Sequence, residues 1–272
     1  MSLCFVSSMN KGIYDEYGKR FIDEFLSYSS SDLSLIIVFE GDIPSELASK
    51  KRLECLPLAQ SNHHRFLKFF GNLYEANGVK IKRSKQPNGQ IATRLEREFR
   101  FDARRFSFKI FSLRLARNHL GPTLPFAWLD ADMRCLQTVT WQDILPFMPD
   151  QHQVMSYLGR TAFPPDAPYS ECGFLGFNPA HPELDAYLGR MEDLYLTGEF
   201  FTKKQWHDSW LWDEVRREFE ARGSEFRNIS GSAETLEHPF INTGLGQFFD
   251  HLKGPTRKKQ GRSFDRDYRS VS

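Results

Sequence analysis

Leu33-Ser-Leu-Ile-Ile-Val-Phe39 is a nearly unbroken apolar run with polar residues on both sides. A strand that is apolar at consecutive positions is buried on both faces, which is typical of a parallel sheet covered by helices. A second short apolar segment, Leu3 to Ser8, precedes it. Between the two, apolar side chains recur at helical spacing from Tyr14 to Leu26. The start of the chain therefore predicts a strand, a helix and a second strand of one sheet.

Strands and helices continue to alternate toward the C-terminus. Apolar periodicity, with Pro and Gly at segment ends, predicts further helices over residues 61–73, 102–119, 182–197 and 208–222. Two more strands are expected at Pro125–Leu129 and Gly173–Asn178. The polar stretch Lys80–Arg94 contains Pro87-Asn-Gly89 and is predicted to be a mobile loop. The expected fold class is α/β, a three-layer α/β/α sandwich with a mostly parallel central sheet.

Composition sets broad limits on the class of protein. The 272 residues, 40% of them hydrophobic, suit one large α/β domain. A formal net charge of +1 does not argue for general nucleic-acid binding. No apolar run reaches about 18 residues, so no transmembrane segment is expected. The first residues lack the basic start of a signal peptide. The four widely spaced cysteines form no Cys-x-x-Cys motif, so they are expected to be reduced thiols of a cytoplasmic protein.

Asp130-Ala131-Asp132 directly follows the predicted strand that ends at Leu129. In open α/β sheets, ligands bind beyond the carboxyl ends of the strands. Two carboxylates around one small residue can hold a hard divalent cation and leave positions open for phosphate oxygens. The same pattern also occurs in solvated turns. A buried strand that delivers two acids to its tip is costly unless the acids meet a partner, which favours a cation site.

His251-Leu-Lys253-Gly254-Pro-Thr-Arg257-Lys258-Lys259 is the second segment that carries chemistry. A neutral imidazole is a good third ligand for a divalent ion. The glycine allows the backbone to approach a phosphate, and the cations can bind phosphate oxygens. From Lys253 to Arg269, seven Lys or Arg stand against two Asp. A basic tail that binds RNA or an anionic membrane would have the same composition.

Together, the two segments resemble the glycogenin-like family 8 glycosyltransferases, which have the GT-A fold. That family pairs Asp-x-Asp with a late His-x-x-Gly-x-x-Lys motif; Asp130, Asp132, His251 and Gly254 match it, and Arg257 stands at the Lys position with Lys258 beside it. The resemblance implies that both acids and the histidine bind Mn²⁺ or Mg²⁺. It also implies that the glycine and neighbouring cations contact a diphosphate, with Lys253, Arg257 and Lys258 all open for that role. The pattern is also similar to uncharacterised bacterial and phage glycosyltransferase-like proteins.

Two further segments are similar to parts of the family that line the sugar site. Glu171-Cys-Gly-Phe-Leu-Gly-Phe-Asn178 resembles an Asn-Ala-Gly-x-x-x-Phe-Asn segment, with Glu171 in place of the first Asn. Trp206-His-Asp208-Ser209 lies where the family has an Asp-Gln pair near the donor sugar, and the Gln is absent here. The resemblance thus makes Glu171 and Asp208 the candidate catalytic residues near the transferring carbon.

Other segments resemble the nucleotide-binding parts of the family. Lys109 lies 21 residues before Asp130 (130 − 109), on a predicted helix where the family has a Lys that reaches donor phosphate, and Arg105 lies one turn earlier. Phe5 to Asn10 resembles the first strand and nucleotide-binding loop of GT-A enzymes, so the nucleotide is expected near Val6, Ser7 and Ser8.

The resemblance implies transfer of a sugar from a UDP- or GDP-sugar to a glycan or other small acceptor, with retention of anomeric configuration; either acid could instead act as the base of an inverting enzyme. We expect residues 1–250 to form the catalytic domain and residues 251–272 to complete the metal and diphosphate site. No nucleic-acid partner is expected. The alternatives are a metal-dependent phosphoesterase, which usually needs more clustered ligands for two metals, and a protein that binds nucleic acid or an anionic surface through its basic tail.

Overall fold

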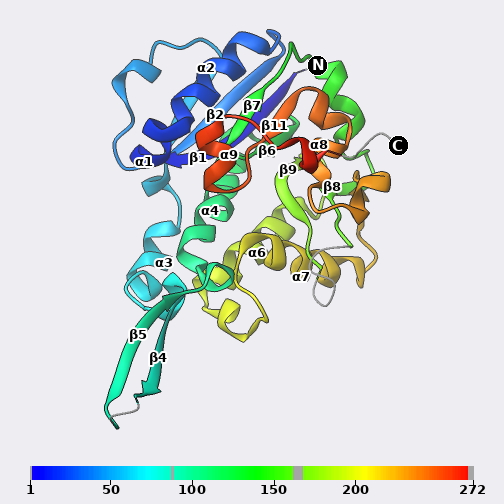
Figure 1. Ribbon diagram of the computed structural model, residues 1–272. Helices are drawn as coiled ribbons and strands as arrows, with labels where there is room; N and C mark the ends of the chain where they lie inside the picture. The colour runs from blue at the N-terminus through cyan, green and yellow to red at the C-terminus, as the bar shows by residue number, and fades with distance from the viewer. Residues whose placement is uncertain (1, 87–88, 162–167, 269–272) are drawn as a thin grey trace.

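The centre of the protein is a seven-stranded sheet with the order β10-β8-β9-β6-β1-β2-β3 (Figure 1). The computed structural model describes residues 2–86, 89–161 and 168–268. Neighbouring strands are parallel except that β9 runs antiparallel to both β6 and β8. The strands of this sheet are β1 (Leu3–Asn10), β2 (Leu33–Glu40), β3 (Leu53–Pro57), β6 (Phe126–Leu129), β8 (Gln153–Leu158), β9 (Glu171–Phe177) and β10 (Glu225–Asn228).

Strand β2 shows why the central strands are apolar at consecutive positions. Ile36 and Val38 belong to the apolar core on one face of the sheet, whereas Leu35, Ile37 and Phe39 belong to the core on the other face. Because successive side chains of a strand point to opposite faces, a strand between two helical layers needs apolar residues at both odd and even positions.

Helices cover both faces of the sheet and complete the three layers. The first core is closed by α3 (His63–Phe70), α4 (Ala103–Leu120), α6 (Leu184–Leu196) and α7 (Asp208–Glu220). The second core is closed by α1 (Lys11–Ile13), α2 (Lys19–Tyr28), α5 (Trp141–Ile144) and α8 (Pro239–Asn242). A π-helical turn, Tyr14–Gly18, joins α1 to α2.

A separate two-stranded sheet joins distant parts of the chain. Strand β7 (Met133–Cys135) follows Asp132 directly, and it pairs antiparallel with β11 (Phe249–His251). A short helix, α9 (Gly254–Gln260), comes after β11. The pairing therefore places the C-terminal segment beside the end of β6.

The α/β/α sandwich and the predicted strands and helices of its core are confirmed. The prediction of a loop at Lys80–Arg94 is wrong, because β4 (Val79–Lys85) and β5 (Ile91–Arg97) form an antiparallel hairpin there. The stretch is polar because both faces of this hairpin are largely exposed. All four cysteines are free thiols. Within the described residues, every helix is too short or too polar to span a lipid bilayer.

Candidate active site

A cleft of about 1380 Å³ opens where β1, β2 and β6 end. Ser8 and Asn10 from β1, Glu40 from β2, and the Asp130–Asp132 segment line its inner side. Helices α4 and α7, together with the segment after β11, form its other walls. The cleft therefore lies where ligands bind in open α/β sheets.

Asp130 and Asp132 lie in the tight connection between β6 and β7. The backbone N–H of Asp130 donates to the carbonyl of Gly173 at 3.0 Å, and the indole N–H of Trp128 donates to Asp130 Oδ1 at 2.6 Å. Asp132 Oδ1 is buried, and its polar contact among the described residues is an ion pair of 3.3 Å with His251 Nε2. A buried carboxylate oxygen needs a compensating positive charge, so this oxygen fits a site where a cation binds.

His251 meets the two acids because β11 pairs with β7, which places it opposite Met133. Its Nε2 lies 3.3 Å from Asp132 Oδ1 and 3.6 Å from Asp130 Oδ2. One ligand atom from each of the three side chains lies within 4.8 Å of the other two. The structure therefore brings together the three residues that the sequence predicts as cation ligands.

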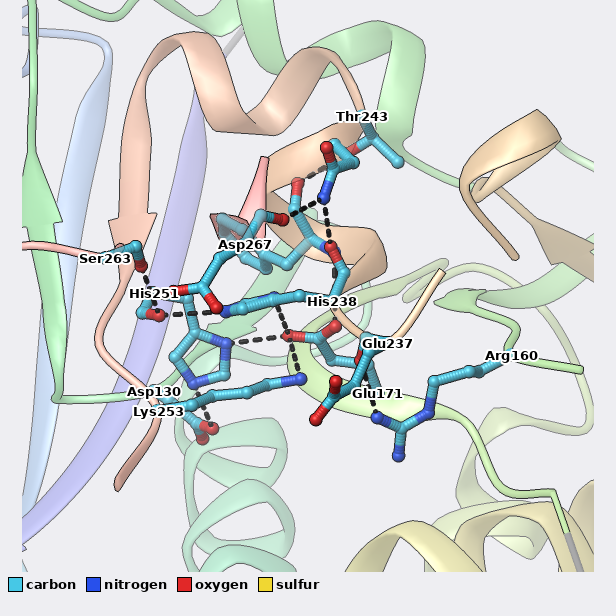
Figure 2. A network of polar contacts seen from close by, with 12 residues as sticks. Asp130, Arg160, Glu171, Glu237, His238, Thr243, His251, Lys253, Ser263 and Asp267 are labelled. Atoms are coloured by element: carbon cyan, nitrogen blue, oxygen red, sulfur yellow. Dashed lines mark hydrogen bonds and ion pairs between the residues drawn. The ribbon is translucent and has the colours of Figure 1, made fainter. Parts of the chain in front are cut away.

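Glu171, the first residue of β9, lies beside His251 (Figure 2). Its Oε1 is 2.8 Å from His251 Nδ1, 2.9 Å from Lys253 Nζ and 3.3 Å from His238 Nδ1. Its Oε2 accepts a hydrogen bond of 3.2 Å from the backbone N–H of Phe240. Glu171, which the sequence suggests as a catalytic residue, thus has both carboxylate oxygens in contact with other residues of the protein.

The charges of this network shift the pKa values of its members. Burial alone would raise the pKa of Glu171, but Lys253 and His238 hold it well below its usual value. Burial alone would lower the pKa of His251, but Asp132 and Glu171 raise it to about 9. In the cation-free protein at neutral pH, His251 is therefore an imidazolium between two carboxylates.

Gly173 makes room for this imidazole. A Cβ on Gly173 would lie 2.7 Å from both Nδ1 and Cε1 of His251. No ordinary contact is that short, so any larger residue here requires His251 to move. The glycine of the Glu-Cys-Gly segment thus has a steric role beside the predicted cation site.

Lys109 on α4 connects two of the predicted site residues. Its Nζ is 3.0 Å from Asp130 Oδ1 and 2.7 Å from Asp208 Oδ2, and it donates to the carbonyl of Cys172 at 2.8 Å. Burial alone would lower the pKa of Lys109, but the two carboxylates raise it well above its usual value. Asp208, the first residue of α7, lines the cleft. Lys109 is therefore a buried permanent cation that holds Asp130 and Asp208 together.

Three of the cations after β11 are paired with acids. Lys258 Nζ lies 2.9 Å from Asp132 Oδ2 and Lys253 binds Glu171, whereas Arg257 Nε donates to Asp267 at 2.6 Å. All three cations line the cleft. Their pairing favours a role inside the cleft over a free basic tail.

Gly254 and Arg105 also line the cleft. Gly254 has φ of +79°, a left-handed conformation that L side chains rarely adopt, and nothing occupies the space where a Cβ would lie. It is therefore the backbone conformation, and not crowding, that favours glycine here. Arg105 lies one turn before Lys109, with its guanidinium 5.3 Å from the ring centroid of Phe99.

The end of β1 differs in detail from the sequence-based expectation. Val6 and Ser7 are fully buried in the sheet, whereas Ser8 lines the cleft. Asn10, the last residue of the segment that resembles a nucleotide-binding loop, also lines it, as does Tyr17, which sequence reasoning missed. Asn10 caps α1 by accepting a hydrogen bond from Ile13, a signal readable from the Asn that follows an apolar strand.

A second set of possible ligands, Glu171, His238 and His251, overlaps the first. Both sets share His251, and the ammonium of Lys253 lies 2.9 Å from Glu171. That positive charge opposes a second cation in the same place. The geometry therefore fits one cation and not the pair that many phosphoesterases hold.

The fold is similar to those of several solved glycosyltransferase structures. The glycosyltransferase GlyE of Streptococcus pneumoniae TIGR4 superposes with a TM-score of 0.51 at 11% identity, over 87% of this chain and 47% of GlyE. The chain has a GT-A-like fold. It spans about half the length of GlyE. The GT-A-like sandwich predicted from the sequence is thus confirmed.

Two other solved structures give lower scores. Mouse xyloside xylosyltransferase 1 has a TM-score of 0.47 at 8% identity, over 85% of this chain and 86% of its own. A glycosyltransferase involved in glycosylation of the major capsid of PBCV-1 has a TM-score of 0.48 at 12% identity, over 96% of this chain and 100% of its own. No family model and no curated protein sequence matches the chain.

Proposed function

We propose that this GT-A-like protein is a glycosyltransferase that uses Mn²⁺ or Mg²⁺ and a UDP- or GDP-sugar donor, with a glycan or other small molecule as acceptor. One observation carries the proposal: Asp130, Asp132 and His251 converge within 4.8 Å at the edge of a cleft of about 1380 Å³. The buried Oδ1 of Asp132, whose partner among the described residues is His251 Nε2 at 3.3 Å, would be one of its ligands. Carboxylate and imidazole ligands suit Mn²⁺ and Mg²⁺.

Sugar transfer breaks the bond between the anomeric carbon and the diphosphate, and the electron pair leaves with the diphosphate. When bound, the cation would offset the negative charge that develops there. Lys258 and Lys253 border the cation cluster and would contact diphosphate oxygens. Arg257 is engaged by Asp267, so its main role would be to hold α9 in place. Gly254 and Arg105 would complete the phosphate-binding walls.

The nucleoside would lie toward Ser8 and Asn10 at the end of β1. Asp208 remains the candidate group near the transferring carbon, held in place by Lys109. For Glu171 we propose a positioning role, because its contacts with His251, His238 and Lys253 engage the carboxylate. The acceptor hydroxyl must lose a proton as the new bond forms, and Asp208 or an oxygen of the leaving diphosphate would accept it. The resemblance to family 8 favours retention of configuration, which NMR of the product anomer would test.

The experiment is calorimetry with UDP and GDP, with and without Mn²⁺, followed by a hydrolysis screen over UDP- and GDP-sugars. We expect cation-dependent binding in the wild type and its loss in Asp132→Asn. Asp193→Asn, the same substitution on the exposed face of α6, is the matched control and should change nothing. Equal nucleotide affinity in Asp132→Asn and wild type would overturn the proposal. Cleavage of phosphate monoesters without sugar release would point instead to a phosphoesterase.

A further inference from the structure

The β4–β5 hairpin is a separate two-stranded sheet that projects from the body of the protein (Figure 1). None of its residues belongs to either apolar core. Its last residue, Arg97, and the following Phe99 line the cleft, so the hairpin begins at the cleft rim. Because this long exposed hairpin adds nothing to either core, a role in binding explains it better than a role in stabilising the fold.

The register gives the hairpin two unlike faces. Ile81 lies opposite Leu95, and Lys85 lies opposite Ile91, so these side chains share one face. The three aliphatic side chains are 52% (Ile81), 69% (Ile91) and 59% (Leu95) exposed. Clustered exposed aliphatic residues on a projecting element mark an interaction surface. At the root of the hairpin, two further large apolar side chains, those of Tyr74 and Phe99, are also exposed.

Charge decides what kind of partner fits. The two strands carry six Lys or Arg against one acid, Glu96. On the face without the aliphatic residues, Lys82 pairs with Glu96 at 2.6 Å and Lys80 pairs with Glu98 at 2.9 Å. On the aliphatic face, no carboxylate of the described residues forms an ion pair with Arg83 or Lys85. The aliphatic face therefore combines apolar side chains with uncompensated positive charge.

We propose that this face docks on an anionic phospholipid surface, with Ile81, Ile91 and Leu95 at the acyl boundary and Arg83 and Lys85 on lipid phosphates. Interleaved aliphatic and cationic residues are the pattern of interfacial binding. Self-association through the same face would bring like charges together. Sequence-independent binding of single-stranded nucleic acid stacks bases on aromatic side chains, whereas the exposed apolar residues on this face of the two strands are aliphatic.

The test is cosedimentation of the full chain with vesicles of equal parts phosphatidylcholine and phosphatidylglycerol, or of phosphatidylcholine alone. We expect binding to the anionic vesicles only, and its loss when NaCl rises from about 0.1 M to about 1 M, because the Debye length falls from about 10 Å to about 3 Å. Arg83→Glu should weaken binding at least about tenfold. Arg94→Glu, the same charge change on the opposite face, is the matched control and should weaken it clearly less. Ile81→Ser with Leu95→Ser should also weaken binding about tenfold.

The outcomes separate this proposal from its alternatives. Equal effects of Arg83→Glu and Arg94→Glu, or no effect of the double serine variant, would overturn it. Preferred binding to a homopolymer RNA that ignores the serine substitutions would assign the face to nucleic acid instead. A lipid-free dimer that dissociates on the serine substitutions would assign it to a second copy of the chain. Nucleotide binding by calorimetry should be unchanged in every variant, which shows that the fold is intact.

Discussion

Glu171 Oε1 and His251 Nδ1 lie 2.8 Å apart in the wall of the cleft, and this contact aims the other ring nitrogen at Asp130 and Asp132. An ionised carboxylate has no proton to donate, so Nδ1 carries the hydrogen and Nε2 is the atom available to a cation. Carboxylates that hold metal-binding histidines in this way fix the ring orientation and the tautomer. The role that fits Glu171 is therefore to prepare a ligand.

Cation binding should depend steeply on pH. A raised pKa of about 9 for His251 means that its proton must leave before Nε2 can bind a cation. Apparent Mn²⁺ affinity should therefore rise about tenfold per pH unit up to about pH 9. With an unperturbed histidine, the rise would end at about pH 6.5. Calorimetry in buffers of different ionisation enthalpy should detect release of about one proton near pH 7.5. A flat profile in this range would remove His251 from the site.

The same shift predicts the stability of the cation-free protein. Because the pKa of His251 is raised in the folded state, its protonation stabilises the fold fully below the unfolded value of about 6.5. That stability is lost as pH rises through about 9. Thermal unfolding of wild type and His251→Gln should therefore differ more at pH 6 than at pH 9, and Mn²⁺ should stabilise only the wild type.

Substitution of Glu171 by Gln tests its positioning role. The amide keeps the size and an acceptor for Nδ1, but it removes one of the two charges, those of Asp132 and Glu171, that raise the pKa of His251. The pH at which Mn²⁺ affinity levels off should move down, and the affinity at the plateau should fall about tenfold, the scale for groups that hold a metal ligand.

Glu237→Gln is the control for this substitution, because Glu237 is an exposed acid on the cleft wall. It should leave both the plateau and its pH unchanged. If Glu171→Gln lowers stability but moves neither quantity, Glu171 has a structural role only.

The fold was predictable where burial dictates the pattern. The run at Leu33–Phe39 must lie between two apolar layers, and both layers are present. The hairpin at Val79–Arg97 was missed because neither of its faces is buried, so no apolar alternation marks its strands. Exposed strands carry a weak sequence signal, since their side chains need not match a core.

The site was predictable as a set of residues and less so as a set of contacts. Asp130, Asp132 and His251 lie together, yet the pairing of β7 with β11 that joins them cannot be seen from spacing along the chain. Lys109 was predicted on phosphate, but it lies between Asp130 and Asp208. Partner choice among buried charges depends on distances that only the folded chain defines.

Gly173→Ala should disturb the cation site through sterics alone. The new methyl would lie 2.7 Å from His251 Nδ1 and Cε1, so the ring must shift away from Glu171. We expect a loss of about 1–3 kcal/mol in the free energy of unfolding, the usual scale of overpacking, and at least about tenfold weaker Mn²⁺ binding.

Gly189→Ala provides the matched control for this substitution. Gly189 lies within α6, and a Cβ there meets no other atom within 4 Å. The protein should gain up to about 1 kcal/mol from better helix propensity, with unchanged Mn²⁺ affinity. Unchanged Mn²⁺ affinity in Gly173→Ala would show that the position of His251 does not govern the site.

Lys258→Met should change cation binding and nucleotide binding in opposite directions. Lys258 Nζ lies 2.9 Å from Asp132 Oδ2, so in the cation-free protein it neutralises a predicted ligand and competes with Mn²⁺. Methionine keeps an apolar side chain near Tyr17 and removes the charge, so Mn²⁺ alone should bind a few-fold more tightly. Nucleoside diphosphate binding at saturating Mn²⁺ should weaken about tenfold or more, because one charge-assisted phosphate contact is lost.

The measurements are Mn²⁺ titration by electron paramagnetic resonance and calorimetry with UDP or GDP. Lys259→Met, at the exposed neighbouring position, should change neither quantity. If the affinities of Lys258→Met for Mn²⁺ and for the nucleoside diphosphate changed in the same direction, the idea that Lys258 leaves Asp132 to bind the diphosphate would be wrong.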